Sequence, residues 1–193
     1  MGLIEVMREY VTIDDQYALH IESLFRKKQY NRGAHLLRSG EVAHDVFFVV
    51  EGALRQFYVN EEGDERSCNF IFENDFITDL ESFSQKTTSS SFIKAMVKTT
   101  CLCIRCDDLK ILLKESPEVS EFFRKFVERI AAKSLLRTKS LLYFSPEKQF
   151  LELLEEQPLI FQRVPQVYIA QYLGIAPESL SRIKKRLMVH AKS

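Results

Sequence analysis

The chain has 193 residues and a formal net charge of +0 at pH 7, with 46% hydrophobic and 28% charged residues. This composition is typical of globular proteins and excludes a chain that is disordered throughout. No apolar run approaches the roughly 20 residues that span a bilayer. The N-terminal sequence MGLIEVMREY has neither the basic start nor the apolar core of a secretory signal. We therefore expect a cytoplasmic protein with one large domain or two small ones.

The first region, residues 1–115, is expected to form a β-barrel. A short helix over residues 13–26 precedes β-branched and aromatic runs that recur from residue 29 to residue 106. The breaks at Glu51-Gly52 and at Glu62-Gly63-Asp64 suit hairpin turns, because glycine adopts positive φ readily. Many short strands at regular spacing favour an antiparallel barrel or jelly roll.

Three of the four cysteines stand together in the segment CLCIRC. Such a group can indicate a metal or redox site, but strand alternation places Cys101 and Cys103 on one face, with Leu102 and Ile104 on the other. A tetrahedral site needs four ligands, and Cys68 is the only cysteine outside the segment. The pattern therefore favours buried thiols in a core over a metal site.

The second region, residues 116–144, is expected to be a long dimerisation helix. Ser116, Pro117 and Glu118 form a helix start, and neither glycine nor proline occurs from residue 119 to residue 143. The apolar stripe is broad enough for two neighbours, namely its own barrel and a second copy of the helix. A helix that packs wholly on its own domain is the alternative. The expected dimer contacts are Phe123, Phe126 and Ile130.

The third region, residues 145–193, contains the segment VPQVYIAQYLGIAPESLSRIKKRL. Gly174 stands where a helix ends with a left-handed residue, and Pro177 is tolerated in the first turn of the next helix. The segment therefore predicts a helix, a tight turn and a second helix.

The second helix of this pair divides into two faces at 100° per residue. Leu180, Ile183 and Leu187 share the apolar face. Residues 177–193 hold five basic residues and one acidic residue, a net charge of +4, which favours a polyanion as partner. A helix of this width fits the major groove of B-DNA. The expected base-reading residues are Glu178, Ser181 and Arg182, and the expected phosphate contacts are Ser179, Lys184, Lys185 and Arg186. A merely solvated face is the alternative.

On these segments the sequence resembles bacterial transcription regulators of the Crp/Fnr family. IAQYLGIAPESLSRIKK is the most specific segment, while VVEGALRQFY and ENDFITDLESF resemble the family's barrel hairpin and the approach to its ligand pocket. The resemblance implies an α+β fold with an N-terminal antiparallel double-stranded β-helix (jelly-roll) barrel, a long dimerisation helix and a C-terminal all-α helix-turn-helix domain. It also implies a homodimer that binds double-stranded DNA at TTGA-like half-sites and acts with RNA polymerase.

The resemblance also locates an effector pocket. Members that bind cyclic AMP present a Gly-Glu pair to the ribose and an Arg-Ser pair to the phosphate, where this chain has Thr78-Asp79 and Ser89-Ser90. Without the arginine, the bidentate contact to phosphate is lost. Cyclic AMP is therefore not expected to bind in the family's manner, and the effector stays unidentified. The expected pocket residues are Thr78, Asp79, Leu80, Ser89 and Ser90.

Three other features depart from the family. No cysteine precedes Cys68, so no iron–sulfur cluster of the oxygen-sensing members is expected. The sequence ends at MVHAKS soon after the second helix, so we expect a short or missing wing. Ala176 also stands where a capping Ser or Thr is common.

Two other functions are left open. One is a sensor or interaction module that no longer binds DNA. The other is a cupin-type enzyme, which needs clustered metal ligands. The four histidines are scattered along the chain and form no His-x-His pair, so no catalytic or metal-binding residue is predicted. Their positions are His20, His35, His44 and His190.

Overall fold

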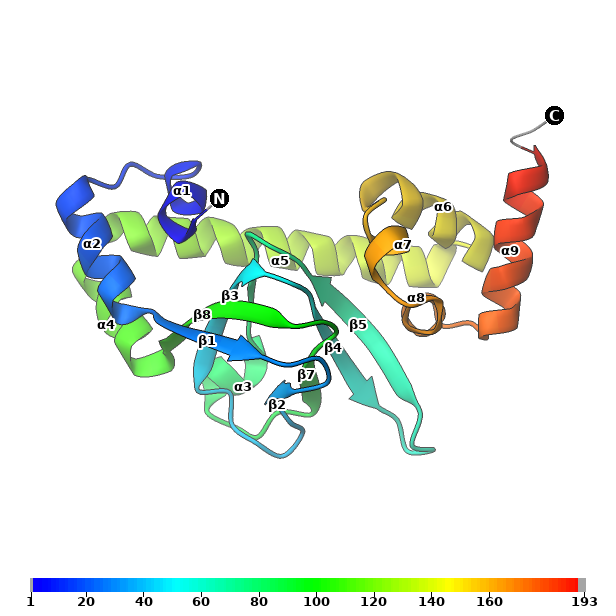
Figure 1. The fold of residues 1–193 in the computed structure, drawn as a ribbon, viewed down its shortest axis with the longest axis horizontal. Helices are drawn as coiled ribbons and strands as arrows, with labels where there is room; N and C mark the ends of the chain where they lie inside the picture. Colours follow the sequence, from blue (N-terminus) through cyan, green and yellow to red (C-terminus); the bar gives the residue numbers. More distant parts are fainter. Residues whose placement is uncertain (1, 191–193) are drawn as a thin grey trace. The chain divides into compact units, whose positions relative to one another are not determined.

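A computed structural model describes residues 2–190, with side chains up to residue 187 (Figure 1). It divides into two compact units. The first comprises the residues up to Gln56 together with Phe70–Ala131, and the second comprises Phe57–Asn69 and the residues from Ala132 onward. The described helices are α1 (Leu3–Arg8), α2 (Asp15–Leu24), α3 (Leu80–Gln85), α4 (Cys106–Glu115), α5 (Pro117–Tyr143), α6 (Pro146–Glu156), α7 (Ile160–Arg163), α8 (Gln166–Leu173) and α9 (Pro177–His190). The described strands are β1 (Arg26–Tyr30), β2 (His35–Leu37), β3 (Asp45–Glu51), β4 (Leu54–Val59), β5 (Glu65–Ile71), β6 (Phe76–Ile77), β7 (Ser91–Ala95) and β8 (Thr99–Arg105).

The strands form two four-stranded sheets, in the orders β1-β8-β3-β6 and β2-β7-β4-β5. Strand β8 pairs antiparallel with β1 and with β3, and β2 pairs antiparallel with β7. This antiparallel core, followed by one long helix and several C-terminal helices, confirms the α+β fold predicted from the sequence.

Strand β8 separates two apolar layers of the first unit. Cys101 and Cys103 are buried in a cluster with the inner strand residues, whereas Ile104 is buried and Leu102 half-buried against the helical layer on the other face. The predicted alternation is confirmed. Burial raises the pKa of Cys101 to about 12 and that of Cys103 to about 11.

The predicted hairpin at Glu51-Gly52 is wrong. Strands β3 and β4 belong to different sheets, so this glycine marks a crossing between sheets. Gly52 has φ +108°, and a Cβ atom there would lie 2.8 Å from the carbonyl oxygen of Lys98. Glycine is therefore required by both the backbone angle and the close approach. The second predicted hairpin is present, because β4 and β5 are neighbours and Gly63 has positive φ.

Helix boundaries follow the capping residues. The hydroxyl of Ser116 accepts a hydrogen bond from the Val119 N–H at 3.2 Å, and that of Ser145 accepts one from the Lys148 N–H at 3.3 Å. Both predicted caps are therefore present. Helices α1 and α4 are additional elements that the sequence pattern does not predict.

The N-terminal part of α5, up to Ala131, packs its apolar side chains within the first unit. The ring of Phe126 is 8% exposed and lies 5.1 Å from that of Phe76. Phe123 and Ile130, which are half-buried, pack against the same cluster. Phe126 thus belongs to the core of its own domain, and the apolar side chains that α5 leaves exposed lie elsewhere. They include Val127, Leu135 and Leu142, which are 44%, 72% and 75% exposed.

Candidate nucleic-acid interface

A sharp turn joins α8 to α9. Helix α8 ends at Gly174, whose φ of 69° lies in the left-handed region. The N–H of Ile175 donates to the carbonyl oxygen of Ala170 at 3.0 Å, which closes the helix end. Ala170 and Leu173 are buried. The predicted helix, turn and helix are therefore present, and they direct α9 away from α8.

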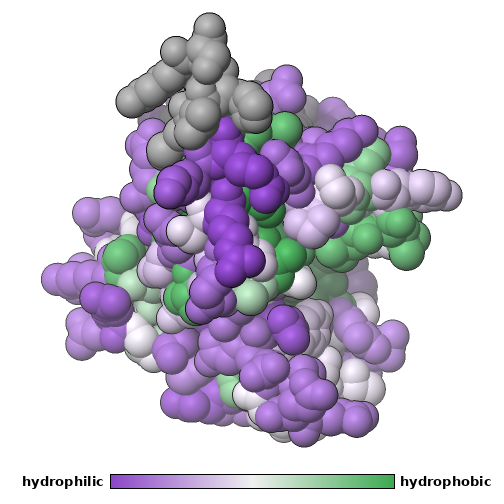
Figure 2. Space-filling view, turned by 90° about the vertical axis from the view of Figure 1, so that its right-hand side faces the viewer, coloured by the Kyte–Doolittle hydropathy of each residue, from purple (hydrophilic) through white to green (hydrophobic). Residues whose placement is uncertain are grey.

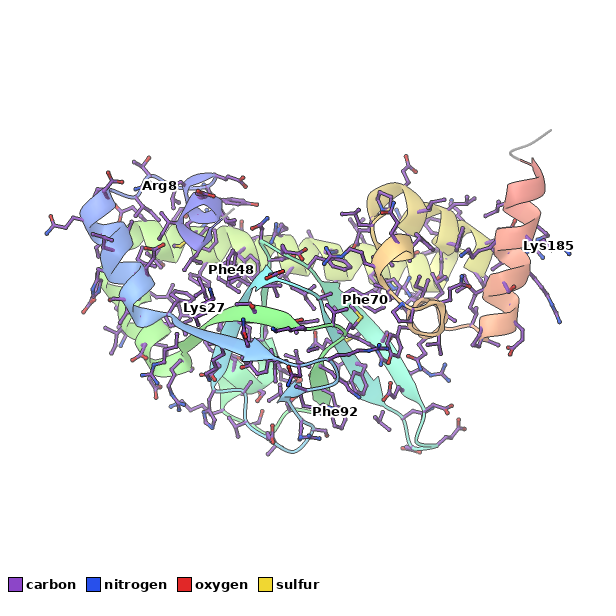
Figure 3. The ribbon with its side chains drawn as sticks, in the orientation of Figure 1. Arg8, Lys27, Phe48, Phe70, Phe92 and Lys185 are labelled. Carbon is purple, nitrogen blue, oxygen red and sulfur yellow. The ribbon has the colours of Figure 1, made fainter. Side chains whose placement is uncertain are left out.

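Helix α9 has the two faces that the sequence predicts. Leu180 and Ile183 are 0% and 5% exposed, whereas Glu178, Ser181 and Arg182 are exposed. Lys185 extends outward from the same helix (Figure 3). On the side of the molecule that shows α9, hydrophilic side chains form most of the surface (Figure 2). The face offers an arginine, a carboxylate and a hydroxyl, which are groups that read base edges.

The four expected phosphate contacts lie in different environments. Lys185 is exposed, while Ser179 and Lys184 are half-buried. Arg186 Nη2 lies 2.9 Å from Glu147 Oε2, so this arginine forms a surface ion pair. Such pairs are weak and exchange readily for another anion. The expected wing falls on residues after α9, which lie outside the described residues.

Two of the residues expected to form an effector pocket take part in a network of hydrogen bonds within the chain. The Asp79 carboxylate accepts hydrogen bonds from the hydroxyl of Ser89 at 2.6 Å, from that of Ser91 at 2.7 Å and from the N–H of Ser82 at 3.1 Å. The last bond caps α3. Burial raises the pKa of Asp79, but these hydrogen bonds outweigh it and leave the pKa below its ordinary value.

The structure therefore brings together two of the five expected pocket residues, Asp79 and Ser89, both buried. The Thr78 hydroxyl donates instead to the carbonyl oxygen of Asp45 at 3.0 Å. Leu80 and Ser90 are exposed. Sequence reasoning missed Ser91, which is fully buried and also accepts a hydrogen bond from Gln56 Nε2 at 3.2 Å. It lies two residues after Ser89, at the start of β7, and this spacing was the available signal.

Within residues 2–187, no group of three or more His, Cys, Asp or Glu side chains is placed to hold a metal ion. Of the helices described, none is both long and apolar enough to cross a bilayer.

Comparison with known proteins identifies one domain of the chain. Residues 27–116 match the family model of the cyclic nucleotide-binding domain. A curated relative, the cAMP-activated global transcriptional regulator CRP of Salmonella typhimurium, is 29% identical over 73 residues. That match covers 38% of this chain and 34% of the relative, so it spans about a third of the curated protein.

Solved structures share the fold over most of the chain. FixK2 from Bradyrhizobium japonicum has a TM-score of 0.76 at 15% identity and covers 86% of both chains. A variant of CooA from Carboxydothermus hydrogenoformans has a TM-score of 0.75 at 20% identity, covering 98% of this chain and 85% of its own. The c-di-GMP responsive regulator CLP of Xanthomonas campestris has a TM-score of 0.72 at 16% identity, covering 92% and 93%.

The fold and the domain match define a cyclic nucleotide-binding-type domain joined by a long helix to a helix-turn-helix. Residues 27–116 therefore belong to the cyclic nucleotide-binding domain family, and the chain has the fold of the solved structures named above.

Proposed function

We propose that the chain is a homodimeric, sequence-specific DNA-binding transcription regulator. The observation that carries this proposal is the exposed polar face of α9. Its apolar side is buried, and it follows the left-handed Gly174 turn. The relatives that share the fold or the domain are transcription regulators, which supports a regulator over an enzyme.

In this proposal Glu178, Ser181 and Arg182 read base edges in the major groove. An arginine donates to O6 and N7 of guanine, and a glutamate accepts from N4 of cytosine. The phosphate contacts are made by Ser179, Lys184, Lys185 and Arg186. Arg186 gives up its ion pair with Glu147 in order to contact a phosphate. RNA polymerase is the further partner that the resemblance to Crp/Fnr regulators suggests.

The proposed dimer uses α5. Val127, Leu135 and Leu142 are exposed on this helix, with the small Ala131 and Thr138 between them. At 100° per residue these five positions fall within a sector of about 80°. A stripe of this kind suits a second copy of the same helix, because exposed apolar side chains gain from burial and small residues allow close approach.

The proposed effector is not cyclic AMP bound in the family's manner. Asp79 carries a negative charge near the start of α3, and Ser89 stands where an arginine would pair with the phosphate. A cyclic phosphate placed there would meet like charge without a guanidinium to neutralise it. Titration calorimetry with cyclic AMP should therefore show no binding that depends on Asp79 or Ser89.

One experiment tests the proposed DNA binding. The full chain is incubated with random genomic fragments, and bound fragments are amplified over several rounds. We expect enrichment of a two-fold symmetric sequence with half-sites about one helical turn apart. Binding that stays salt-sensitive and unselective through all rounds would favour an interaction module that no longer reads DNA.

A further inference from the structure

Arg137 of α5 joins three helices of the second unit. Its guanidinium donates to the main-chain carbonyl oxygen of Tyr172 on α8, and Nη1 donates to Oε1 of Gln149 on α6 at 3.2 Å. The same guanidinium lies over the ring of Tyr172, 4.1 Å from its centroid. Stacking and hydrogen bonding thus act on one residue of α8 at once.

The partners of Arg137 are themselves held in place. Gln149 is buried, and its Nε2 donates to the carbonyl oxygen of Phe144 at 3.0 Å, which fixes Oε1 toward the arginine. One helical turn further along α5, the Ser140 hydroxyl donates to Oε2 of Glu152 on α6 at 3.1 Å. Burial lowers the pKa of Arg137, because part of its hydration has been replaced by these contacts.

The carbonyl that Arg137 binds lies at the C-terminal end of α8. The last four carbonyls of a helix lack an intrahelical partner, and Tyr172 is the residue before the last one of α8. A cation there also interacts favourably with the helix dipole. Gly174 follows two residues later and begins the turn into α9. The direction of α9 therefore depends on how the end of α8 is held.

Arg137 lies on the side of α5 away from the proposed dimer contact. Leu135 is two residues earlier, which on a helix is a rotation of about 200°. The same two turns of α5 therefore present an exposed leucine on one side and the buried arginine contacts on the other.

We propose that Arg137 is a positioning residue for DNA recognition, which holds α8 on α5 and so sets the separation of the two α9 helices in a dimer. This inference rests on the proposed function and adds a residue to it. Arg137 contacts α8 and α6 and touches no DNA. Its effect is on operator geometry: a dimer with fixed α9 helices discriminates against operators whose half-sites are one base pair closer or further apart.

Arg137→Lys tests the proposal in the full-length chain. Lysine keeps the charge but has no planar fork to donate to two carbonyl-type oxygens while stacking on the ring. An operator is first enriched with the wild-type chain, and duplexes with one base pair inserted or removed between the half-sites are then made. Affinity for the native spacing should fall by roughly tenfold, whereas affinity for the altered spacings changes little. The preference for native spacing therefore falls by about the same factor.

Arg124→Ala is the matched control. Arg124 is another arginine of α5, but it is exposed and its ion pairs, among the residues that the structure describes, are with Glu121 and Glu128 of its own helix. Its removal should leave the spacing preference unchanged. Thermal unfolding of each variant shows whether the protein is folded. If Arg137→Lys does not fold, Arg137→Gln takes its place in the test, because glutamine keeps a neutral hydrogen-bond donor.

The outcomes separate the two proposals. A wild-type chain that enriches no sequence would overturn the proposed function together with this inference. If the wild-type chain enriches an operator but the folded Arg137 variant keeps the full spacing preference, the inference alone is wrong. An equal loss of affinity on native, altered and random duplexes would also overturn it, because that is the result expected of a general loss of stability.

Discussion

The Asp79 network and the polar face of α9 are both rich in polar side chains, but they differ in where those side chains find partners. Asp79 is buried and accepts three hydrogen bonds from its own chain. The side chains of Glu178, Ser181 and Arg182 form no hydrogen bond or ion pair within the part of the chain that the structure describes. A buried group whose hydrogen bonds are satisfied stabilises its domain, whereas an exposed group without a partner is free to bind another molecule.

The largest effect is expected where the buried network is broken. Asp79→Ala removes the cap of α3 and leaves the hydroxyls of Ser89 and Ser91 without their acceptor. The free energy of unfolding should fall by about 2–4 kcal/mol, as measured by urea denaturation followed by circular dichroism. Glu81→Ala, at an exposed position in the first turn of α3, should change it by less than about 0.5 kcal/mol. Similar values for the two variants would mean that the network does not stabilise the sensor domain.

The comparison also shows what the sequence could predict. The helix-turn-helix rests on local signals, namely Gly174, Pro177 and apolar residues at spacings of three and four, so its faces follow from the sequence. Cys101 and Cys103 alternate with Leu102 and Ile104 along one strand, so the faces on which they lie also follow from the local sequence. These features depend on neighbours within one or two turns, and the structure has them as predicted.

Features that depend on distant partners were missed. Gly52 reads as a hairpin turn, because nothing nearby in the sequence shows that the strands on either side join different sheets. Phe126 matches a dimer stripe as well as it matches a core, and only the position of Phe76 decides between them. Arg137 binds a main-chain carbonyl 35 residues away, for which a sequence carries no signal.

The second prediction concerns the α9 face. Arg182→Ala should weaken binding to an enriched operator by about 1–3 kcal/mol and relax the preference at one base pair, because a bidentate contact to guanine is lost. Binding to random duplexes should change much less. Fluorescence anisotropy with an operator and its single-base variants gives both quantities.

Arg186→Ala is the matched comparison for that prediction. It removes the same side chain from the same helix at a position proposed to contact phosphate, so affinity should fall equally for operator and random DNA. If Arg182→Ala and Arg186→Ala gave the same profile, the assignment of base-reading and phosphate-contacting faces would be wrong.

The third prediction uses pH to sharpen the description of Asp79. Its pKa is lower in the folded chain than the ordinary value of about 3.9, despite the opposing effect of burial. The ionised carboxylate therefore adds stability that is complete above about pH 5 and is lost as the pH falls through the folded-state pKa. The difference in stability between wild type and Asp79→Asn should be constant from about pH 8 to 5 and shrink at lower pH. A difference that grows below pH 4 would show that Asp79 is protonated in the folded protein.

The smallest effect is expected at Lys185, which is exposed on α9 and is proposed to contact phosphate. A lysine that contacts phosphate releases counterions from DNA, so its contribution is independent of sequence and sensitive to salt. Lys185→Ala should weaken binding equally for operator and random duplexes, and the slope of log K against log salt concentration should fall by about 1. Lys114→Ala removes the same charge from the exposed last turn of α4 and should leave that slope unchanged. An equal change in slope from both variants would mean that only net charge matters, and that α9 offers DNA no surface distinct from the rest of the molecule.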